Sequence, residues 1–249
     1  MGSNPASRTK FKVHSDYLNG PFVFGMKRRL ALFDLDHTLI SYDSGADLLR
    51  FLVARELVDA GFVDRYTEHC IEYVAGRVDL RQLNREYYAL LMRYPVESLT
   101  AWRNEWREES GKHVSAAAMR LVHSHHASGD LCCLVTATSE FIASAYREIF
   151  GFEHMVATRI AMAEGPQGSF ISGEVEGLLN YREGKIANVR DWLLAQGLDW
   201  SSFDESVFYS DSFNDLPLLE YVSHPVAVTP DARLRAVAIE RGWRILDLA

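Results

Sequence analysis

The sequence of 249 residues is short of cysteine, of basic charge and of long apolar runs. Its cysteines, Cys70, Cys132 and Cys133, show no metal or redox spacing, so we expect buried, reduced thiols in a cytoplasmic protein. The 26 basic residues are outnumbered by 34 acidic ones, and a formal net charge of −8 argues against a nucleic-acid partner. No apolar run approaches the roughly 20 residues that cross a bilayer, which argues against a membrane partner.

The first 25 residues lack an apolar segment of roughly 7–15 residues, the central feature of a secretory signal. They are rich in glycine, asparagine, proline and serine instead, so we expect residues 1–25 to be a disordered extension. The folded part is expected to start near Met26. With 48% hydrophobic residues, it can form one large domain or a domain with a substantial insertion.

Short apolar runs alternate with amphipathic segments over most of the chain. The expected strands are 30–34, 131–135, 154–157, 206–210, 225–228 and 243–246. The expected helices are 114–127, 139–150, 184–196, 214–221 and 231–240. This alternation predicts an α/β fold in which a Rossmann-like parallel sheet has helices on both faces.

The interval 45–112 interrupts this alternation, because it contains apolar residues at three- and four-residue steps and no convincing strand. We expect it to form a helical cap inserted after the first strand, with residues 26–44 and 113–249 forming the core. Glycine and proline at 165–168, between short β-like runs, predict a hairpin or irregular flap within 158–182.

Acidic residues follow two of the expected strands. Asp34 and Asp36 follow the first strand, and Asp211 and Asp215 follow the strand at 206–210. Ligands of open α/β sheets collect at the carboxyl ends of the strands, so these acids are expected to meet. Carboxylate oxygens favour a hard cation, and Mg²⁺ is the first candidate.

Two further segments complete a pattern that suits phosphoryl transfer. Thr136 and Ala137 end a strand before a helix, and their hydroxyl and backbone N–H groups suit a phosphate dianion. Lys185 follows a glycine at a helix start and offers a compact cation. A carboxylate beside Mg²⁺ can act as nucleophile, and a second carboxyl can transfer protons. Taken singly, all of these segments except the one with Asp34 and Asp36 are more simply explained as helix caps or surface charges, but their common order at strand ends favours one site.

The motifs Asp-Leu-Asp-His-Thr-Leu at 34–39 and Asp-Ser-Phe-Asn-Asp at 211–215 resemble those of the haloacid dehalogenase superfamily of phosphohydrolases, over roughly residues 28–246. The insertion after the first strand is similar to the cap of subfamily IB, which includes phosphoserine phosphatase-like and histidinol-phosphatase-like members. The resemblance implies Asp34 as nucleophile, Asp36 as acid and base, Thr136 and Lys185 at the phosphoryl group with Asn214 nearby, Mg²⁺ held by Asp34, the Asp36 carbonyl and Asp211, and Asp215 as support for the metal.

The substrate is less well defined by the sequence. Asp43 lies nine residues after Asp34, where phosphoserine phosphatases have an amine-binding glutamate, but it could equally cap the helix near 45. A carboxylate on the substrate could be bound by an arginine of the cap. The candidates are Arg55, Arg77, Arg81, Arg85 and Arg93. A phosphorylated, aminated metabolite is therefore expected, similar to phosphoserine or to histidinol phosphate.

Two other functions remain open: phosphotransfer to an acceptor other than water, and a non-catalytic sensor of a phosphorylated ligand. Asp36 favours hydrolysis, since a second acid speeds turnover of an aspartyl phosphate. The sequence gives no argument for an oligomeric state. His123, His125 and His126 near the end of the helix 114–127 are expected on the surface, because partly charged histidines suit a helix C-terminus.

Overall fold

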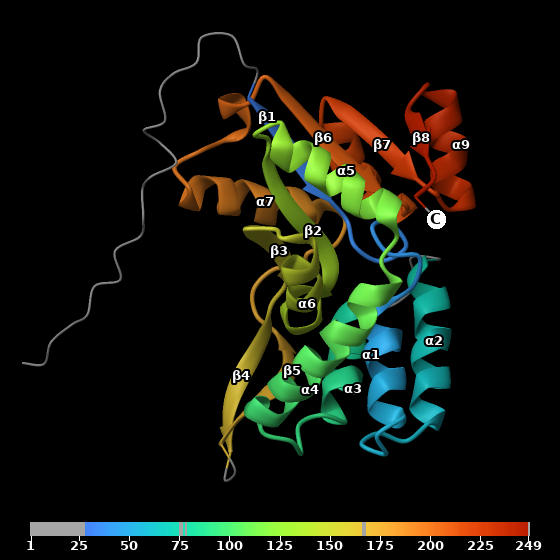
Figure 1. Ribbon diagram of the computed structural model, residues 1–249, viewed down its shortest axis with the longest axis vertical. Coiled ribbons are helices and arrows are strands. Elements are labelled where there is room, and N and C mark those ends of the chain that lie inside the picture. The colour runs from blue at the N-terminus through green and yellow to red at the C-terminus, as the bar shows by residue number, and fades with distance from the viewer. Residues whose placement is uncertain (1–27, 75–76, 78, 166–167, 249) are drawn as a thin grey trace, which may run out of the picture.

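A computed structural model describes residues 28–74, 77, 79–165 and 168–248 (Figure 1). The expected extension at 1–25 lies outside the described residues. Within them, a six-stranded parallel sheet has the order β3-β2-β1-β6-β7-β8. Its strands are β1 (Arg29–Phe33), β2 (Leu131–Ser139), β3 (His154–Thr158), β6 (Glu205–Ser210), β7 (His224–Val228) and β8 (Arg244–Leu246). The expected α/β fold with a parallel sheet is confirmed.

Alternation along β1 divides the core between the two faces of the sheet. Leu30 and Leu32 face one layer, while Ala31 and Phe33 face the other, and all four are fully buried. The Leu30 side packs with α7 (Glu183–Ala195), α8 (Leu216–Tyr221) and α9 (Ala232–Glu240). The Phe33 side packs with α5 (Ala116–Ala127) and α6 (Glu140–Phe150). Two buried faces explain why the central strands are continuously apolar.

Four helices lie between β1 and the α5–β2 pair in the sequence. They are α1 (Ser44–Val53), α2 (Gly61–Val74), α3 (Leu80–Ala89) and α4 (Val96–Ser110), followed by a short 3-10 helix at Gly111–His113. We call α1–α4 the helical insertion; in Figure 1 it forms a group below the sheet. The exact boundary between core and cap stays a prediction.

An antiparallel hairpin of β4 (Ile160–Gly165) and β5 (Gly168–Val175) follows β3, as expected within 158–182. It extends away from the sheet alongside the helical insertion (Figure 1), and β5 packs against α3. The Arg81 guanidinium of α3 donates hydrogen bonds to the carbonyl oxygens of Val175 and Gly177 at 3.3 and 2.9 Å. The hairpin therefore supports α3 from outside.

Local differences from expectation come from tertiary contacts. β2 continues to Ser139 instead of ending near residue 135, because Ser139 pairs with Thr158 beyond a shift of register. His125 is buried rather than on the surface, since its ring is held by the Asp130 carboxylate at 2.5 Å and the Tyr209 hydroxyl at 2.8 Å. In the described part of the chain, none of the helices has the length and apolarity of a membrane span.

Candidate active site

Asp34 begins the loop at the carboxyl end of β1. Its backbone N–H donates to the Tyr209 carbonyl of β6 at 2.9 Å, which continues the sheet pairing by one residue. The chain then turns tightly, because the Leu35 carbonyl accepts the N–H groups of Thr38, Leu39 and Ile40. The turn returns the Thr38 hydroxyl to Asp34 Oδ2 at 3.2 Å.

Lys185, from the first turn of α7, connects two of the acids. Its Nζ donates to Asp34 Oδ1 at 2.9 Å and to Asp215 Oδ2 at 2.7 Å, and all three side chains are buried. Burial alone would lower the pKa of Lys185, but attraction to Asp215 and Asp34 outweighs it and raises that pKa. Burial also raises the pKa of Asp34 to about 7, although Lys185 opposes this effect. Lys185 is therefore a fixed cation at Asp34.

Asp211 joins the same cluster from the end of β6. The Thr38 hydroxyl lies 3.0 Å from Asp211 Oδ1 and also accepts the Asp211 N–H at 2.9 Å. Thr38 therefore bridges Asp34 and Asp211, which are 177 positions apart in the chain. Burial, followed by repulsion from Asp34 and Asp215, raises the pKa of Asp211 well above its ordinary value. This apposition of carboxyls costs electrostatic energy unless protons or a cation offset it.

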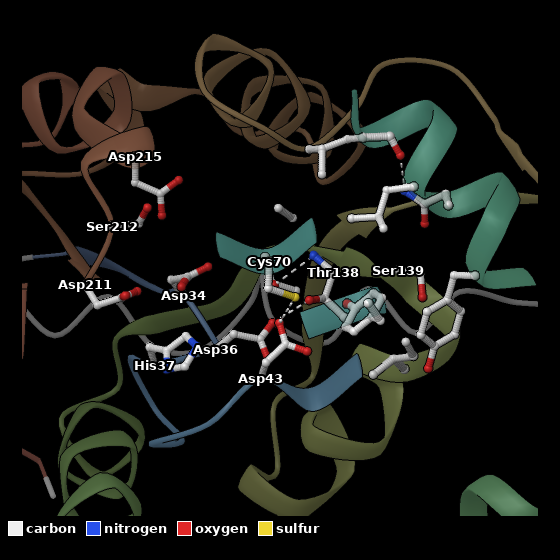
Figure 2. A pocket seen from close by; sticks show the side chains of 18 of the residues that line it. Asp34, Asp36, His37, Asp43, Cys70, Thr138, Ser139, Asp211, Ser212 and Asp215 are labelled. Carbon is white, nitrogen blue, oxygen red and sulfur yellow. Dashed lines mark hydrogen bonds between the residues drawn. The ribbon is translucent and has the colours of Figure 1, made fainter. Parts of the chain in front are cut away.

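Asp36 is held by two donors from different parts of the fold. The Ser44 N–H, at the start of α1, donates to its Oδ1 at 2.6 Å. The Thr138 hydroxyl, near the end of β2, donates to its Oδ2 (Figure 2). The Asp36 carboxyl therefore has a defined orientation at the junction of the sheet and the helical insertion.

Thr136 and Ala137 lie beside these acids, at the end of β2. The buried Thr136 hydroxyl accepts the Thr138 N–H at 3.1 Å, and Asn180 donates to the Thr136 carbonyl at 2.8 Å. The Thr158 hydroxyl donates to the Ala137 carbonyl at 2.8 Å. These contacts fix the backbone of the segment on which a phosphate site is expected.

A cavity of about 110 Å³ opens between the sheet and the helical insertion (Figure 2). Since a cavity needs roughly 10–15 Å³ to hold one water, this cavity can hold a small ligand. One end contains the acids described above, and α3 and α2 line the other. Its lining includes Asp34, Asp36, Asp211, Asp215, Thr136, Ala137, Thr138, Asp43, Tyr66, Cys70, Asn84, Tyr87 and Tyr88.

Asp43 caps α1 and also lines the cavity, while its binding of a substrate amine stays a prediction. Its Oδ1 accepts the Ala46 N–H at 2.7 Å and so caps α1, while its Oδ2 lies 3.6 Å from the Cys70 Sγ at the cavity. Burial, followed by repulsion from Asp36, raises the pKa of Asp43 to about 6. An acid therefore lines the cavity beyond the cluster around Asp34.

Asn214 and Lys185 are the predicted site residues that do not line the cavity. Lys185 contacts two acids that do, Asp34 and Asp215, whereas Asn214 has other partners. It is buried, and its Oδ1 accepts a hydrogen bond from Arg182 at 3.2 Å. The candidate arginines of the helical insertion also lie elsewhere. Arg55 contacts Glu105 and Glu109, Arg77 contacts Glu72, Arg81 contacts the Val175 and Gly177 carbonyls, Arg85 contacts Glu174, and Arg93 contacts the Leu57 carbonyl.

Several groups in the site were not assigned a role from the sequence. Thr38 belongs to the first motif, but only the folded structure shows that it bridges to Asp211. Ser210 donates to Asp215 Oδ2 at 2.7 Å, and the Tyr88 hydroxyl of α3 contacts Ser139 Oγ. The contacts of Thr38 with Asp211 and of Tyr88 with Ser139 join distant segments, so no local pattern could have revealed them.

Comparison with known proteins identifies the family of the chain. The family model described as haloacid dehalogenase-like hydrolase matches residues 31–220. A histidinol-phosphatase of Neisseria meningitidis is 36% identical over 222 residues, which cover 88% of this chain and 99% of the relative. A phosphoserine phosphatase of Mycobacterium tuberculosis is 30% identical over 222 residues, covering 87% of this chain and 70% of that protein.

Solved structures share the fold. A protein of unknown function from Bordetella pertussis is 38% identical, with a TM-score of 0.81 over 90% of this chain and 100% of that chain. A substrate-bound phosphoserine phosphatase has a TM-score of 0.63 at 18% identity, over 88% of this chain and 93% of that one, and this likeness concerns the fold alone. The chain belongs to the haloacid dehalogenase-like hydrolase family, and its curated relatives include phosphatases.

Proposed function

We propose that this hydrolase is a Mg²⁺-dependent phosphomonoesterase that acts on a small aminated metabolite through an aspartyl phosphate on Asp34. The observation that carries the proposal is that Asp34 and Asp211, bridged by Thr38, line one end of the cavity while Lys185 donates a hydrogen bond to Asp34. The phosphatase names of relatives at 30–36% identity support it.

The residues have complementary roles in this proposal. An Asp34 oxygen attacks phosphorus, and the bond between phosphorus and the ester oxygen breaks. The Asp36 carboxyl gives its proton to the departing oxygen, and then takes a proton from the water that attacks the aspartyl phosphate. Lys185 offsets negative charge on Asp34 and the phosphoryl group, and Thr136 and Ala137 bind phosphoryl oxygens. Asn214 does not line the cavity, so in this proposal it supports the neighbouring site residues without contacting the substrate.

The charges of the site fit a divalent cation. Asp34 and Asp215 are buried, Asp211 is partly buried, and Lys185 contacts Asp34 and Asp215. The Oδ1 atom of Asp215 is buried without a hydrogen-bond partner among the described residues. Asp34, Asp211 and the Asp36 carbonyl would hold Mg²⁺, with Asp215 behind them. When bound, Mg²⁺ would neutralise the phosphoryl oxygens and the attacking carboxylate.

Fewer than three side chains are needed for such a site, since Mg²⁺ usually keeps several waters. Among the described residues, no group of three or more His, Cys, Asp or Glu side chains is arranged as a metal cluster.

The other end of the cavity favours an amine without a nearby carboxylate. Asp43 supplies negative charge there, Tyr66 and Tyr87 supply apolar surface, and none of the described lining residues is Arg or Lys. A substrate carboxylate would therefore meet acids and no cation. Histidinol phosphate has this chemistry, whereas phosphoserine carries a carboxylate. The helical insertion closes this end and would act as the cap that selects the substrate.

The test is phosphate release from matched esters in the presence of Mg²⁺. Phosphoserine and phosphoethanolamine differ by one carboxylate, so we expect a higher kcat/KM for phosphoethanolamine, and a still higher value for histidinol phosphate. EDTA and the Asp34→Asn variant should each abolish turnover.

If the wild type, the wild type with EDTA and Asp34→Asn all released phosphate at the rate of buffer alone, the proposed phosphatase activity would be excluded. Preference for phosphoserine over phosphoethanolamine would contradict the substrate class and leave the phosphatase proposal intact. Release that needs an added alcohol would instead indicate phosphotransfer.

A further inference from the structure

The proposed chemistry requires Asp36 to point at the ester oxygen when it transfers a proton. A carboxyl on a flexible aspartate rotates freely unless its oxygens are engaged. Here both are engaged: Oδ1 by the Ser44 N–H and Oδ2 by the Thr138 hydroxyl. A carboxylate has about four acceptor positions, so these donors leave others available for the reaction.

The segment that carries Thr138 is itself held firmly. Its N–H donates to the Thr136 hydroxyl, and the carbonyls of Thr136 and Ala137 accept hydrogen bonds from Asn180 and Thr158. Asn180 and Thr158 are fully buried. The Thr138 hydroxyl is therefore presented from a fixed backbone, which is the condition for orienting another side chain.

We propose that Thr138 is a positioning residue for proton transfer: its hydroxyl, together with the Ser44 N–H of the helical insertion, orients the Asp36 carboxyl toward the leaving oxygen. This inference rests on the proposed phosphatase function. It assigns to the end of β2 a second task, distinct from the binding of phosphate by Thr136 and Ala137.

The leaving group distinguishes this role from a structural one. An alkoxide must be protonated as it departs, whereas p-nitrophenolate is stable enough to leave without a proton. Misdirection of Asp36 should therefore slow the alkyl ester more than the nitrophenyl ester. The value of kcat/KM is the proper measure, because it covers the steps up to departure of the leaving group.

The experiment compares Thr138→Val with the wild type on p-nitrophenyl phosphate and on the most rapidly cleaved alkyl ester of the panel above. Since a general acid contributes roughly 10²–10⁴-fold, we expect kcat/KM to fall about tenfold or more for the alkyl ester and less than about threefold for the nitrophenyl ester. Thr138→Ser keeps the hydroxyl and should restore the alkyl ester to within about threefold of the wild type.

Thr158→Val is the matched control, because it removes a hydroxyl that supports the same segment without contacting Asp36. It should slow both esters by the same factor. Thr138→Ala replaces the valine variant if circular dichroism shows that valine disturbs the fold.

An unchanged ratio of the two kcat/KM values in Thr138→Val and Thr138→Ala would overturn the positioning role while leaving the phosphatase proposal standing. Failure of Thr138→Ser to restore the alkyl ester would also overturn it. A wild-type protein that releases phosphate from neither ester would overturn the proposed function, and this inference with it.

Discussion

Asp43 combines a structural contact and a contact at the cavity in a single side chain. One carboxyl oxygen caps α1, and the other lies at the cavity beside Cys70. Its burial raises its pKa from 3.8 to about 6, so the folded protein holds this group neutral more readily than the unfolded chain does. The ionised form of Asp43, which would attract a substrate amine, therefore lowers the free energy of unfolding of the ligand-free protein.

We expect Asp43→Asn to stabilise the metal-free protein at pH 8 and to raise KM for an aminated ester. The stability linked to the neutral group is fully present below its unfolded pKa of 3.8 and is lost as pH rises through about 6. Asparagine caps helices as well as aspartate, so the gain should reach at most about 3 kcal/mol at pH 8 and vanish near pH 4. Urea unfolding at the two pH values measures it.

Asp79→Asn is the control, since Asp79 is the exposed cap of α3 and does not line the cavity. It should leave KM for the aminated ester unchanged. Equal behaviour of the two variants would contradict the assignment of Asp43 to the substrate amine.

The acids of the site could be predicted from the sequence because strand ends bring them together whatever the details of the fold. Asp34, Asp36 and Asp211 follow apolar strands that pair directly as β1 and β6. The groups that orient them could not be predicted. In the sequence, Thr138 is one of several hydroxyl-bearing residues before a helix. Its contact with Asp36 depends on the turn after β1 and on the packing of α1 beside that turn.

At the scale of elements, the β4–β5 hairpin and α3 form one unit that walls the cavity. Gly173 of β5 has a positive φ of 78°, and an added Cβ would lie 3.1 Å from the Arg85 Cα and 3.2 Å from the Asn84 carbonyl oxygen of α3. Asn84 and Tyr88 line the cavity from this same helix. The hairpin can therefore approach α3 closely only with glycine at this position.

We expect Gly173→Ala to displace α3 and to raise KM for the aminated ester several-fold while destabilising the fold by about 1–3 kcal/mol. The KM for p-nitrophenyl phosphate, which lacks the amine, should change less. Steady-state kinetics with both esters and urea unfolding provide the measurements.

Gly168→Ala in the same strand is the matched control. Gly168 also has a positive φ, of 107°, but no described atom lies within 4 Å of an added Cβ. It should cost stability with no selective effect on KM. Similar kinetic changes in both variants would show that strain in the hairpin, rather than contact with α3, is responsible.

Helices and strands with a clear apolar pattern could be predicted from the sequence, but the way in which they pack against one another could not. The core strands and helices begin and end close to the expected residues because apolar runs and caps define them locally. β2 was predicted too short, since its last residues are hydroxyl-bearing and owe their strand pairing to Thr158. The packing of β5 on α3 joins segments about 90 residues apart, so only the folded chain shows it.

At the scale of the whole molecule, the excess of negative charge includes carboxylates that lie close together in the site, where their repulsion destabilises the folded state. The formal net charge is −8. Asp34 and Asp215 lie buried against Lys185, and the partly buried Asp211 is linked to Asp34 through Thr38. A bound divalent cation would relieve this repulsion in the folded state alone. Folding stability and metal binding should therefore be coupled.

We expect Mg²⁺ to raise the Tm relative to EDTA, with a stabilisation of about 2.7 kcal/mol when free Mg²⁺ is about 100 times its Kd. Asp211→Asn should abolish this increase, whereas Asp199→Asn, at an exposed helix cap, should retain it. Thermal unfolding followed by circular dichroism gives both values. The same Mg²⁺ shift in Asp211→Asn would place the cation elsewhere.

The neighbouring cysteines of β2 have a practical consequence. Cys132 belongs to the core beneath α5, and Cys133 to the core beneath α7, on opposite faces of the sheet. Both thiols are free and buried, so neither reacts until its own helical layer separates. Timed alkylation followed by mass mapping would thus record, from the thiols of two consecutive residues, which side of the sheet loosens first.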